Sequence, residues 1–215
     1  MSVTVKICGL TTPETLDAAV AAGADFVGYN FYPPSPRYLS LEAAPDLTAR
    51  TPKSVRRVGV FVDASDEILA RAIEAAGLEF LQLHGAEPPE RVTAIKARFG
   101  LPVIKAVAIA GPADVDGAEA FACLADWLLF DAKPPQKADA LPGGNAERFD
   151  WSLLAGREWS LPWMISGGLD AGNVAEALAV TGAGAVDVSS GVERERGVKD
   201  AGMIGAFIAA ARAAE

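Results

Sequence analysis

The stretches AAGADFVG (21–28), AAGLEFLQ (75–82) and TGAGAVDV (181–188) decide the fold, because each repeats the same joint between a helix and a strand. In each stretch an alanine-rich segment of helical period reaches a glycine, and a short apolar run follows. Gly23, Gly77 and Gly184 are predicted to end their helices, since glycine readily adopts the left-handed conformation found there. The chain is therefore predicted to repeat one unit of strand and helix.

Working outward from these joints, the sequence contains eight short apolar runs with little alternation, as expected of strands that are buried on both faces. The runs begin near Val3, Phe26, Arg57, Phe80, Val103, Trp127, Trp163 and Ala185. Helices are predicted at about 12–22, 41–49, 66–76, 88–99, 114–124, 151–155, 173–180 and 201–213. Because no long linker rich in proline, glycine or serine interrupts this alternation, residues 1–215 are predicted to form a single domain.

The spacing of the runs distinguishes two architectures that such units can build, an open doubly wound sheet and a closed (β/α)8 barrel. Five of the seven intervals between strand starts are nearly equal, at about 22 to 24 residues. Units of equal length favour the closed barrel, because an open sheet would tolerate more variation in their length. No GxGxxG motif follows the first strand, which argues against a dinucleotide-binding fold. We therefore expect an α/β protein with one (β/α)8 TIM barrel.

Composition limits the classes of partner. The chain has 19 Lys and Arg against 28 Asp and Glu, a net charge of −9, which disfavours non-specific binding to nucleic acid or to an anionic membrane. An anionic ligand would therefore have to be held by hydrogen-bond donors at its own site, because the overall charge does not attract it. No apolar signal core or stretch of about 18 apolar residues occurs. With only two cysteines and no disulfide framework, a cytoplasmic protein with reduced thiols is expected.

The predicted strands end on residues that can donate, accept or transfer a proton. Because the C-terminal ends of the strands meet at one rim of a barrel, where barrel enzymes carry their active sites, the pattern predicts an enzyme. The strand-end residues are Cys8, Asn30, Asp63, His84, Lys105, Asp131, Ser166 and Ser189.

Two of these residues are candidates for proton transfer. Cys8 could act as a thiolate assisted by Lys6 and by the next helix N-terminus, or it could be a small buried apolar residue. Asp131 ends the apolar run WLLFD, where desolvation would raise its pKa and suit it to general acid catalysis; a helix cap or a salt bridge is the alternative. Cys123 is expected to pack in the core.

Other positions suggest ligand contacts. The glycine-rich loops SGGLDAGNV (166–174) and DVSSGVE (187–193) are typical of a shared phosphate site, since barrels often build one after strands 7 and 8. His84, the only histidine, could line the site as a donor or make a structural hydrogen bond. Arg37 could clamp a carboxylate or be a solvated surface charge. Lys105 could form a Schiff base, but an ion pair is the commoner role.

These motifs together resemble one enzyme family, phosphoribosylanthranilate isomerase of tryptophan biosynthesis. The resemblance runs in order from about Lys6 to Asp200, and KICG, QLHG and FDW are its most specific elements. The matching stretches are KICGLT (6–11), FVGYNFYPPSPRYLS (26–40), VGVFVD (58–63), LQLHG (81–85), LLFDAK (128–133), LPGGNAERFDW (141–151), SGGLDAGNV and DVSSGVE with GVKD (197–200).

The resemblance implies a (β/α)8 barrel that converts N-(5-phosphoribosyl)anthranilate to 1-(2-carboxyphenylamino)-1-deoxyribulose 5-phosphate by an Amadori rearrangement. It implies a small phosphosugar substrate, no cofactor and no metal, and it leaves any protein partner unknown. Carried onto this sequence, the general base is Cys8, the general acid is Asp131, and Arg37 binds the anthranilate carboxylate. The phosphate would be held by Gly167, Gly168, Ser189 and Ser190.

The chain departs from the family pattern in the loop 132–148, where a common GGTG string is replaced by GGNA ending in Asn145 and Ala146. Alanine restricts the backbone where glycine would permit a positive φ. Three other interpretations remain: the histidine-pathway isomerase, which would prefer an aspartate base at Cys8; indoleglycerol-phosphate synthase, which would want catalytic Lys and Glu on early strands; and a phospholigand sensor without turnover.

Overall fold

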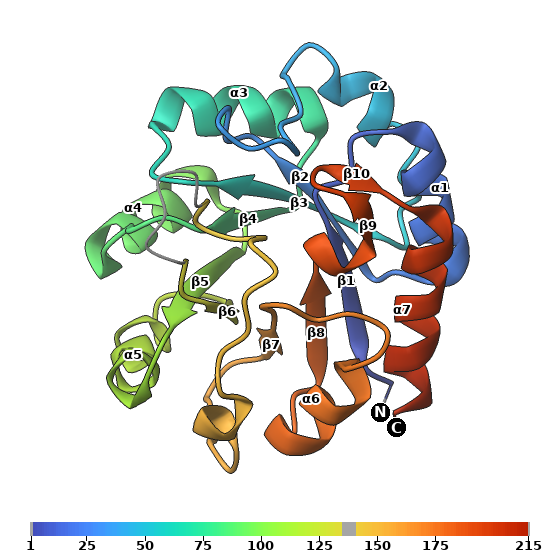
Figure 1. Ribbon diagram of the computed structural model, residues 1–215. Coiled ribbons are helices and arrows are strands. Elements are labelled where there is room, and N and C mark those ends of the chain that lie inside the picture. The colour runs from blue at the N-terminus through green and yellow to red at the C-terminus, as the bar shows by residue number, and fades with distance from the viewer. Residues whose placement is uncertain (1, 135–140, 215) are drawn as a thin grey trace.

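A computed structural model describes residues 2–134 and 141–214. In these residues, parallel strands β1 to β8 pair in chain order, and β8 pairs with β1, so the sheet closes on itself (Figure 1). The predicted (β/α)8 barrel is confirmed. The strands are β1 (Thr4–Cys8), β2 (Phe26–Asn30), β3 (Arg56–Phe61), β4 (Phe80–Leu83), β5 (Val103–Ile109), β6 (Trp127–Ala132), β7 (Trp163–Ile165) and β8 (Ala185–Val188).

Helices surround the strands, and some differ from the predicted ranges (Figure 1). The helix expected at 41–49 is reduced to one short turn, and the one expected at 114–124 divides into an α-helix and a 3-10 helix. The segment 151–155 is also a 3-10 helix. The elements are α1 (Pro13–Ala22), α2 (Ala44–Thr48), α3 (Asp66–Ala76), α4 (Pro89–Phe99), α5 (Pro112–Gly117), η1 (Ala118–Phe121), η2 (Trp151–Leu154), α6 (Val174–Thr181), η3 (Ser190–Val192) and α7 (Ala201–Ala213).

The glycine joints end their helices in the expected way at two of the three positions. Gly23 and Gly77 cap α1 and α3 with φ of 92° and 55°. The prediction for Gly184 is wrong, because α6 is capped by Gly182 with φ of 70°. Gly184 directly precedes β8, and its carbonyl accepts a hydrogen bond of 2.9 Å from Thr4 N–H.

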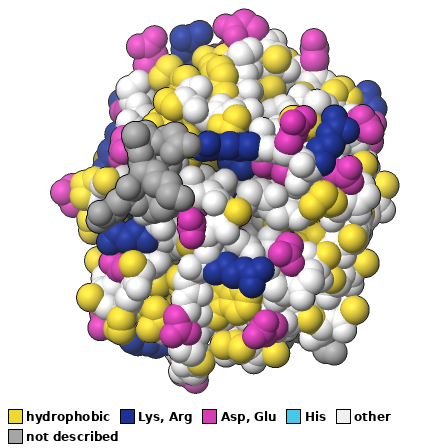
Figure 2. All heavy atoms as spheres, viewed as in Figure 1, with side chains coloured by type: hydrophobic (Ala, Val, Ile, Leu, Met, Phe, Trp, Pro, Cys, Tyr) yellow, Lys and Arg dark blue, Asp and Glu magenta, His cyan; other side chains and the backbone are white. Residues whose placement is uncertain are grey.

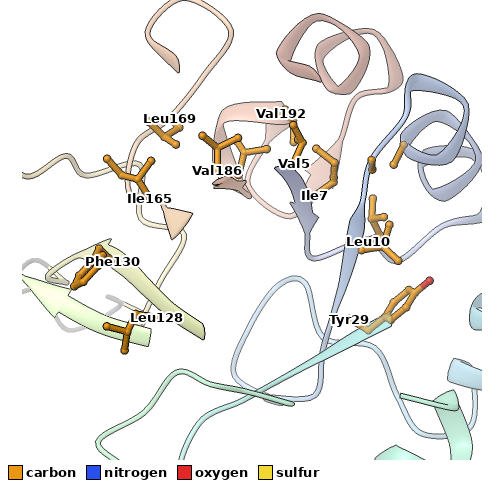
Figure 3. Close-up of a cluster of buried hydrophobic side chains, with 14 of the residues drawn as sticks. Val5, Ile7, Leu10, Tyr29, Leu128, Phe130, Ile165, Leu169, Val186 and Val192 are labelled. Carbon is orange, nitrogen blue, oxygen red and sulfur yellow. The ribbon is translucent and has the colours of Figure 1, made fainter. Parts of the chain in front are cut away.

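The strands are apolar on both faces, as the sequence predicts. Toward the helices, they contribute to a large buried cluster that Figure 3 shows in close-up. Toward the barrel axis lies a second cluster, formed by Phe26, Val58, Ile104, Ala106, Leu129, Met164 and Ala185. Two positions after Leu129, Met164 and Ala185, the same face carries polar residues, Asp131, Ser166 and Asp187, which are all buried. The barrel interior thus changes from apolar to polar toward its C-terminal rim.

Between β8 and α7 the chain forms η3 and a small antiparallel hairpin of β9 (Glu193–Glu195) and β10 (Val198–Lys199). The sequence analysis did not anticipate this hairpin. Figure 1 shows it beside the ends of β1 and β8, so it lies at the same rim as the polar strand ends.

The surface carries acidic and basic side chains interspersed with uncharged atoms on the face seen in Figure 2. Cys123 is exposed, which corrects the expectation that it packs in the core; the segment that carries it follows η1 as an irregular turn on the outside of the barrel. Among the described residues, none of the helices has the length and apolar character needed to cross a membrane.

Candidate active site

A pocket of about 750 Å³, including its open mouth, lies at the C-terminal ends of the strands. All the predicted site residues line it: Cys8, Arg37, His84, Asp131, Gly167, Gly168, Ser189 and Ser190. Asn30 and Ser166, from the strand-end series, line it as well.

Cys8 ends β1 and is buried, with 8% of its surface exposed. Its sulfur lies over Gly28 of the neighbouring strand: a Cβ added there would be 2.9 Å from Cys8 Sγ and 3.2 Å from Lys6 Nζ. Burial raises the pKa of the Cys8 thiol, and Asp187 adds to the rise. Lys6 and Lys199 work in the opposite direction, because their positive charges favour the thiolate.

A buried ion pair lies directly beneath Cys8. Closure of the barrel sets Lys6 of β1 opposite Asp187 of β8, and Lys6 Nζ donates to Asp187 Oδ1 over 2.7 Å. Ser166 Oγ donates to the other carboxylate oxygen over 3.3 Å. Burial works to lower the pKa of Lys6, but attraction to Asp187 and Cys8 outweighs it and the pKa is raised. Lys6 therefore keeps a positive charge next to the sulfur.

Asp131 is the last residue but one of β6 and is 6% exposed. Its Oδ1 accepts from Ala132 N–H over 2.9 Å, and its Oδ2 lies 3.2 Å from His84 Nε2. The side-chain amide nitrogen of Gln82 is 2.7 Å from His84 Nδ1, so Nδ1 accepts and the ring proton sits on Nε2, facing Asp131. Gln82 Oε1 has no hydrogen-bond partner among the described residues.

The loop after β6 packs against the two sides of the pocket through consecutive glycines. A Cβ on Gly143 would be 2.6 Å from His84 Nε2 and 2.8 Å from Asp131 Oδ2. On Gly144, where φ is +72°, a Cβ would be 2.5 Å from Arg37 Nη1. Only glycine therefore fits at either position without displacing a site residue.

The two residues that depart from the family pattern are accommodated differently. The Asn145 side chain accepts from Leu141 N–H over 3.1 Å and donates to Leu141 O over 2.6 Å, which closes a turn. Ala146 has a positive φ of 59°, the left-handed conformation for which glycine is better suited. Residues 135–140 of the predicted loop 132–148 lie outside the described residues.

The predicted phosphate residues lie together where β7 and β8 end. Gly167 and Gly168 have φ of +84° and +62°, and a Cβ on Gly167 would be 2.7 Å from Ala132 N. Asn173, at the start of α6, donates to Gly168 O over 2.9 Å and so fixes the loop. Ser189 Oγ donates to Cys8 O over 3.2 Å, which links this loop to β1. The arrangement brings two backbone segments close together, as an anion site requires.

Arg37 is 3% exposed, which excludes the alternative of a solvated surface charge. It pairs with Glu193 of β9, a residue that the sequence analysis did not single out. The sequence signal for Glu193 was its position as an acidic residue at the end of the glycine- and serine-containing loop DVSSGVE. Asp187 and Gln82 were also missed, although a charge or amide inside a short apolar strand indicates a paired interior position.

Two of the strand-end residues lie outside the pocket lining. Lys105 is within β5 and pairs with Glu87 over 2.8 Å, as the ion-pair alternative predicted. Asp63 adopts a φ of 47° and its Oδ1 accepts from Ala86 N–H over 2.9 Å, so it braces the loop after β4. In the part of the chain that the structure describes, no three His, Cys, Asp or Glu side chains are grouped to hold a metal ion.

Comparison with known proteins then identifies the family. The model of the N-(5'-phosphoribosyl)anthranilate (PRA) isomerase family matches residues 5–210. The chain belongs to this family. The resemblance seen in the motifs is confirmed, and the isomerase activity of tryptophan biosynthesis goes with the family.

Curated relatives match over almost their whole length. The N-(5'-phosphoribosyl)anthranilate isomerase of Paramagnetospirillum magneticum is 53% identical over 99% of this chain and 98% of its own, and that of Rhodospirillum centenum is 54% identical over 99% and 100%.

Solved structures of isomerases in the family share the barrel. The phosphoribosylanthranilate isomerase of Thermotoga maritima superposes with a TM-score of 0.88 at 40% identity, covering 98% of this chain and 99% of that one. A structure of the isomerase in complex with reduced 1-(o-carboxyphenylamino)-1-deoxyribulose 5-phosphate superposes with a TM-score of 0.83 at 38% identity, with the same coverage.

Proposed function

We propose that this isomerase rearranges N-(5-phosphoribosyl)anthranilate with Cys8 as general base and Asp131 as general acid. The observation that carries the proposal is that a thiol and a carboxyl group from β1 and β6, well separated around the closed barrel, line one pocket at the C-terminal ends of the strands. A pentose between them could exchange a proton with each.

The chemical steps balance without a cofactor. Asp131 donates a proton to the furanose oxygen, the C1–O bond breaks, and the nitrogen lone pair forms an iminium at C1. The iminium makes the C2 proton acidic, and the Cys8 thiolate removes it. The electrons of the C2–H bond form an enol-amine, which tautomerises to the 2-ketone. One proton is supplied and one is removed, so substrate and product are isomers.

The surroundings of Cys8 support its part in this route. A buried thiol with a raised pKa is a strong base once it is ionised, and Lys6 offers the thiolate a neighbouring positive charge. On the other side, His84 Nε2 faces Asp131 and the pocket, and it is proposed to bind the substrate as a hydrogen-bond donor.

The two ends of the substrate have separate anchors. The phosphate is proposed to bind at the backbone N–H groups around Gly167, Gly168, Ser189 and Ser190, where positive φ angles at the glycines bring the backbone close. The anthranilate carboxylate is proposed to bind Arg37. Both anchors are local donors, as a chain with a net charge of −9 requires.

The test follows the loss of anthranilate fluorescence when purified protein meets phosphoribosylanthranilate formed in situ. Cys8→Ala and Asp131→Asn are expected to lower kcat by about 10²–10⁴ each, with a much smaller change in KM, because each removes one positioned proton transfer. Circular dichroism checks that both variants remain folded.

Cys123→Ala and Asp63→Asn are the matched controls, one for each residue type, since both side chains lie outside the pocket lining. Both should keep wild-type kcat. A Cys8→Ala or Asp131→Asn protein that retains more than about a tenth of the wild-type kcat contradicts the assigned role. Wild-type protein that binds the substrate without accelerating its conversion would instead support a phospholigand sensor.

The setting proposed for this activity is the cytoplasm, with a small phosphosugar as the ligand. Both cysteines are free thiols, which fits a reducing compartment.

A further inference from the structure

Three charged side chains are buried together beside the pocket. Arg37, in the segment after β2, lies against Glu193 and Lys199 of the β9–β10 hairpin, and the three side chains are 3%, 3% and 1% exposed. Glu193 binds both cations: its Oε1 accepts from Arg37 Nε over 2.7 Å and from Lys199 Nζ over 2.5 Å. Buried charges of this kind need full pairing to be tolerated.

Glu193 occupies one edge of the guanidinium group. Its second oxygen, Oε2, accepts from Arg37 Nη2 over 2.8 Å, so the Nε–Nη2 edge is held by a two-point ion pair. The remaining edge consists of Nη1 and the second hydrogen of Nη2. Nη2 donates to Gly144 O over 3.1 Å, and Nη1 has no hydrogen-bond partner among the described residues.

Nη1 is therefore the part of Arg37 that is available to a ligand. Arg37 lines the pocket, and Nη1 is the atom that a Cβ at Gly144 would approach to 2.5 Å, so the absence of a side chain at Gly144 keeps this nitrogen uncovered. Both hydrogens of Nη2 are already donated, to Glu193 Oε2 and to Gly144 O, so a substrate carboxylate would accept charge-assisted hydrogen bonds from Nη1.

The cluster is fixed to the rest of the site. Glu193 Oε2 also accepts from Gly197 N–H over 3.0 Å within the hairpin. Lys199 Nζ donates to the Ser189 carbonyl over 2.9 Å and to its hydroxyl over 3.1 Å. Although burial favours the neutral acid, the hydrogen bond from Arg37 and the charges of Lys199 and Arg37 lower the pKa of Glu193 to about 2. Two cations and one carboxylate leave one positive charge in excess, which matches one substrate carboxylate.

We propose that Glu193 is a positioning residue that holds Arg37 with its Nη1 toward the pocket, and thereby sets the preference of the enzyme for a substrate bearing a carboxylate on its aromatic ring. The inference rests on the proposed binding of the anthranilate carboxylate by Arg37. It adds the β9–β10 hairpin to the elements that determine specificity.

The test compares two ligands in the wild type and in Glu193→Gln, which keeps the side-chain shape but removes the charge. The ligands are reduced 1-(o-carboxyphenylamino)-1-deoxyribulose 5-phosphate and the phenylamino compound that lacks the carboxylate, with Kd measured by calorimetry. We expect Glu193→Gln to raise Kd for the carboxylate ligand about 10-fold and to leave Kd for the other ligand within about 2-fold. In kinetics, KM for phosphoribosylanthranilate should rise while kcat changes little.

Glu195→Gln, an exposed change on the same hairpin, is the matched control and should alter neither Kd. Arg37→Lys should abolish the preference for the carboxylate ligand, and adding Glu193→Gln to it should have no further effect on that preference. Inorganic phosphate, bound at the other end of the pocket, should compete equally well in the wild type and in Glu193→Gln, which verifies that the variant is folded around its site.

Equal weakening of both ligands in Glu193→Gln would mean that Glu193 supports the structure only, and tighter binding of the carboxylate ligand would mean that Glu193 competes for Arg37. Either result overturns the inference. Because calorimetry needs no turnover, these outcomes are separate from a failure of the proposed proton transfers, which would appear as binding without catalysis in the wild type.

Discussion

Gly28 of β2 leaves room for the sulfur of Cys8 and the ammonium group of Lys6, which both lie beside it on β1. It sits opposite Cys8 in the strand register, and its backbone carbonyl accepts the N–H groups of Gly9 and Leu10 over 2.8 and 3.1 Å. The missing side chain leaves the space that both groups occupy. A residue with no functional group therefore governs the environment of the proposed base.

Gly28→Ala tests this at the residue scale. The added Cβ would be 2.9 Å from Cys8 Sγ and 3.1 Å from Cys8 Cα, and since the latter is backbone, the contact cannot be relieved by a rotamer change alone. We expect kcat/KM to fall at least about 10-fold and the free energy of unfolding to fall by about 1–3 kcal/mol, as for an overpacked core. Steady-state kinetics and urea unfolding measure the two effects.

Gly184→Ala is the matched control, because a Cβ there meets no atom within 4 Å and the backbone does not have a positive φ. This variant should retain wild-type activity. Gly28→Ala with unchanged kcat/KM would show that the spacing of the sulfur and the ammonium group does not matter for turnover.

At the same scale, individual residues show what could be predicted from sequence. Cys8 and Asp131 were recognisable because each ends an apolar strand within a specific motif. Glu193 was not, because its importance depends on a hairpin that folds back to Arg37, 156 positions away in the chain. Cys123 was misjudged because the apolar residues around it fit a helix, whereas the helix ends with η1 and Cys123 lies exposed in the turn that follows.

Among the elements, β5 is tied to the segment that follows β4 by one buried lysine. Lys105 Nζ donates to Glu87 Oε2 and to Gly85 O, each over 2.8 Å. Glu87 in turn accepts from the backbone N–H groups of Asp63 and Gly85, over 2.9 Å in each case. The connections after β3 and β4 and the strand β5 therefore converge on one carboxylate.

Lys105→Met should lower the free energy of unfolding by about 3–5 kcal/mol, since it leaves the Glu87 charge buried without a counterion. Adding Glu87→Gln should recover part of the loss by removing that charge. Lys96→Met is the control, because the Lys96–Asp126 pair is 40% and 34% exposed and should contribute less than about 1 kcal/mol. If Lys105→Met costs no more than Lys96→Met in urea unfolding, the buried pair does not tie these elements together.

The elements themselves were largely predictable, and the exceptions have physical reasons. Apolar runs of four to six residues between alanine-rich segments identified the barrel strands, because a strand covered on both faces has no polar side. The hairpin β9–β10 was missed, since its sequence ERERGVK is polar and its pairing comes from the surrounding contacts rather than from an apolar pattern. The cap of α6 was misplaced by two residues because 182 and 184 are both glycine.

At the scale of the whole molecule, Tyr29 makes the free energy of unfolding depend on pH in the alkaline range. Tyr29 is fully buried between the barrel and its helices (Figure 3), and burial raises its pKa to about 12, although a 2.7 Å hydrogen bond with Thr51 and the charge of Arg57 oppose the shift. Unfolded tyrosine ionises near pH 10. The stabilisation is therefore complete below about pH 10 and is lost as the pH rises toward 12.

Tyr29→Phe should remove this contribution to the loss of stability at alkaline pH. The contribution amounts to roughly 2–3 kcal/mol for a pKa shift of about two units. At pH 7 the variant should be about 1 kcal/mol less stable, because the Thr51 hydroxyl loses its partner. Urea unfolding at pH 7, 9.5 and 11 measures both effects. Tyr38→Phe, at a side chain that is 39% exposed, should follow the wild-type pH dependence; a Tyr29→Phe protein that does the same refutes the assignment.

Helices α1 and α7 pack together where the barrel closes, and Arg212 near the end of α7 donates to Val3 O and to Ser2 Oγ at the start of the chain. Figure 1 shows the two ends side by side. The molecule is thus a ring of repeated units in which the last unit and the first are held together by side-chain contacts rather than by a peptide bond. If the two ends were joined by a peptide linker and new ends were made at another joint, such as the one before β8, each strand and helix would keep its neighbours. We therefore expect a protein permuted in this way to form the same barrel.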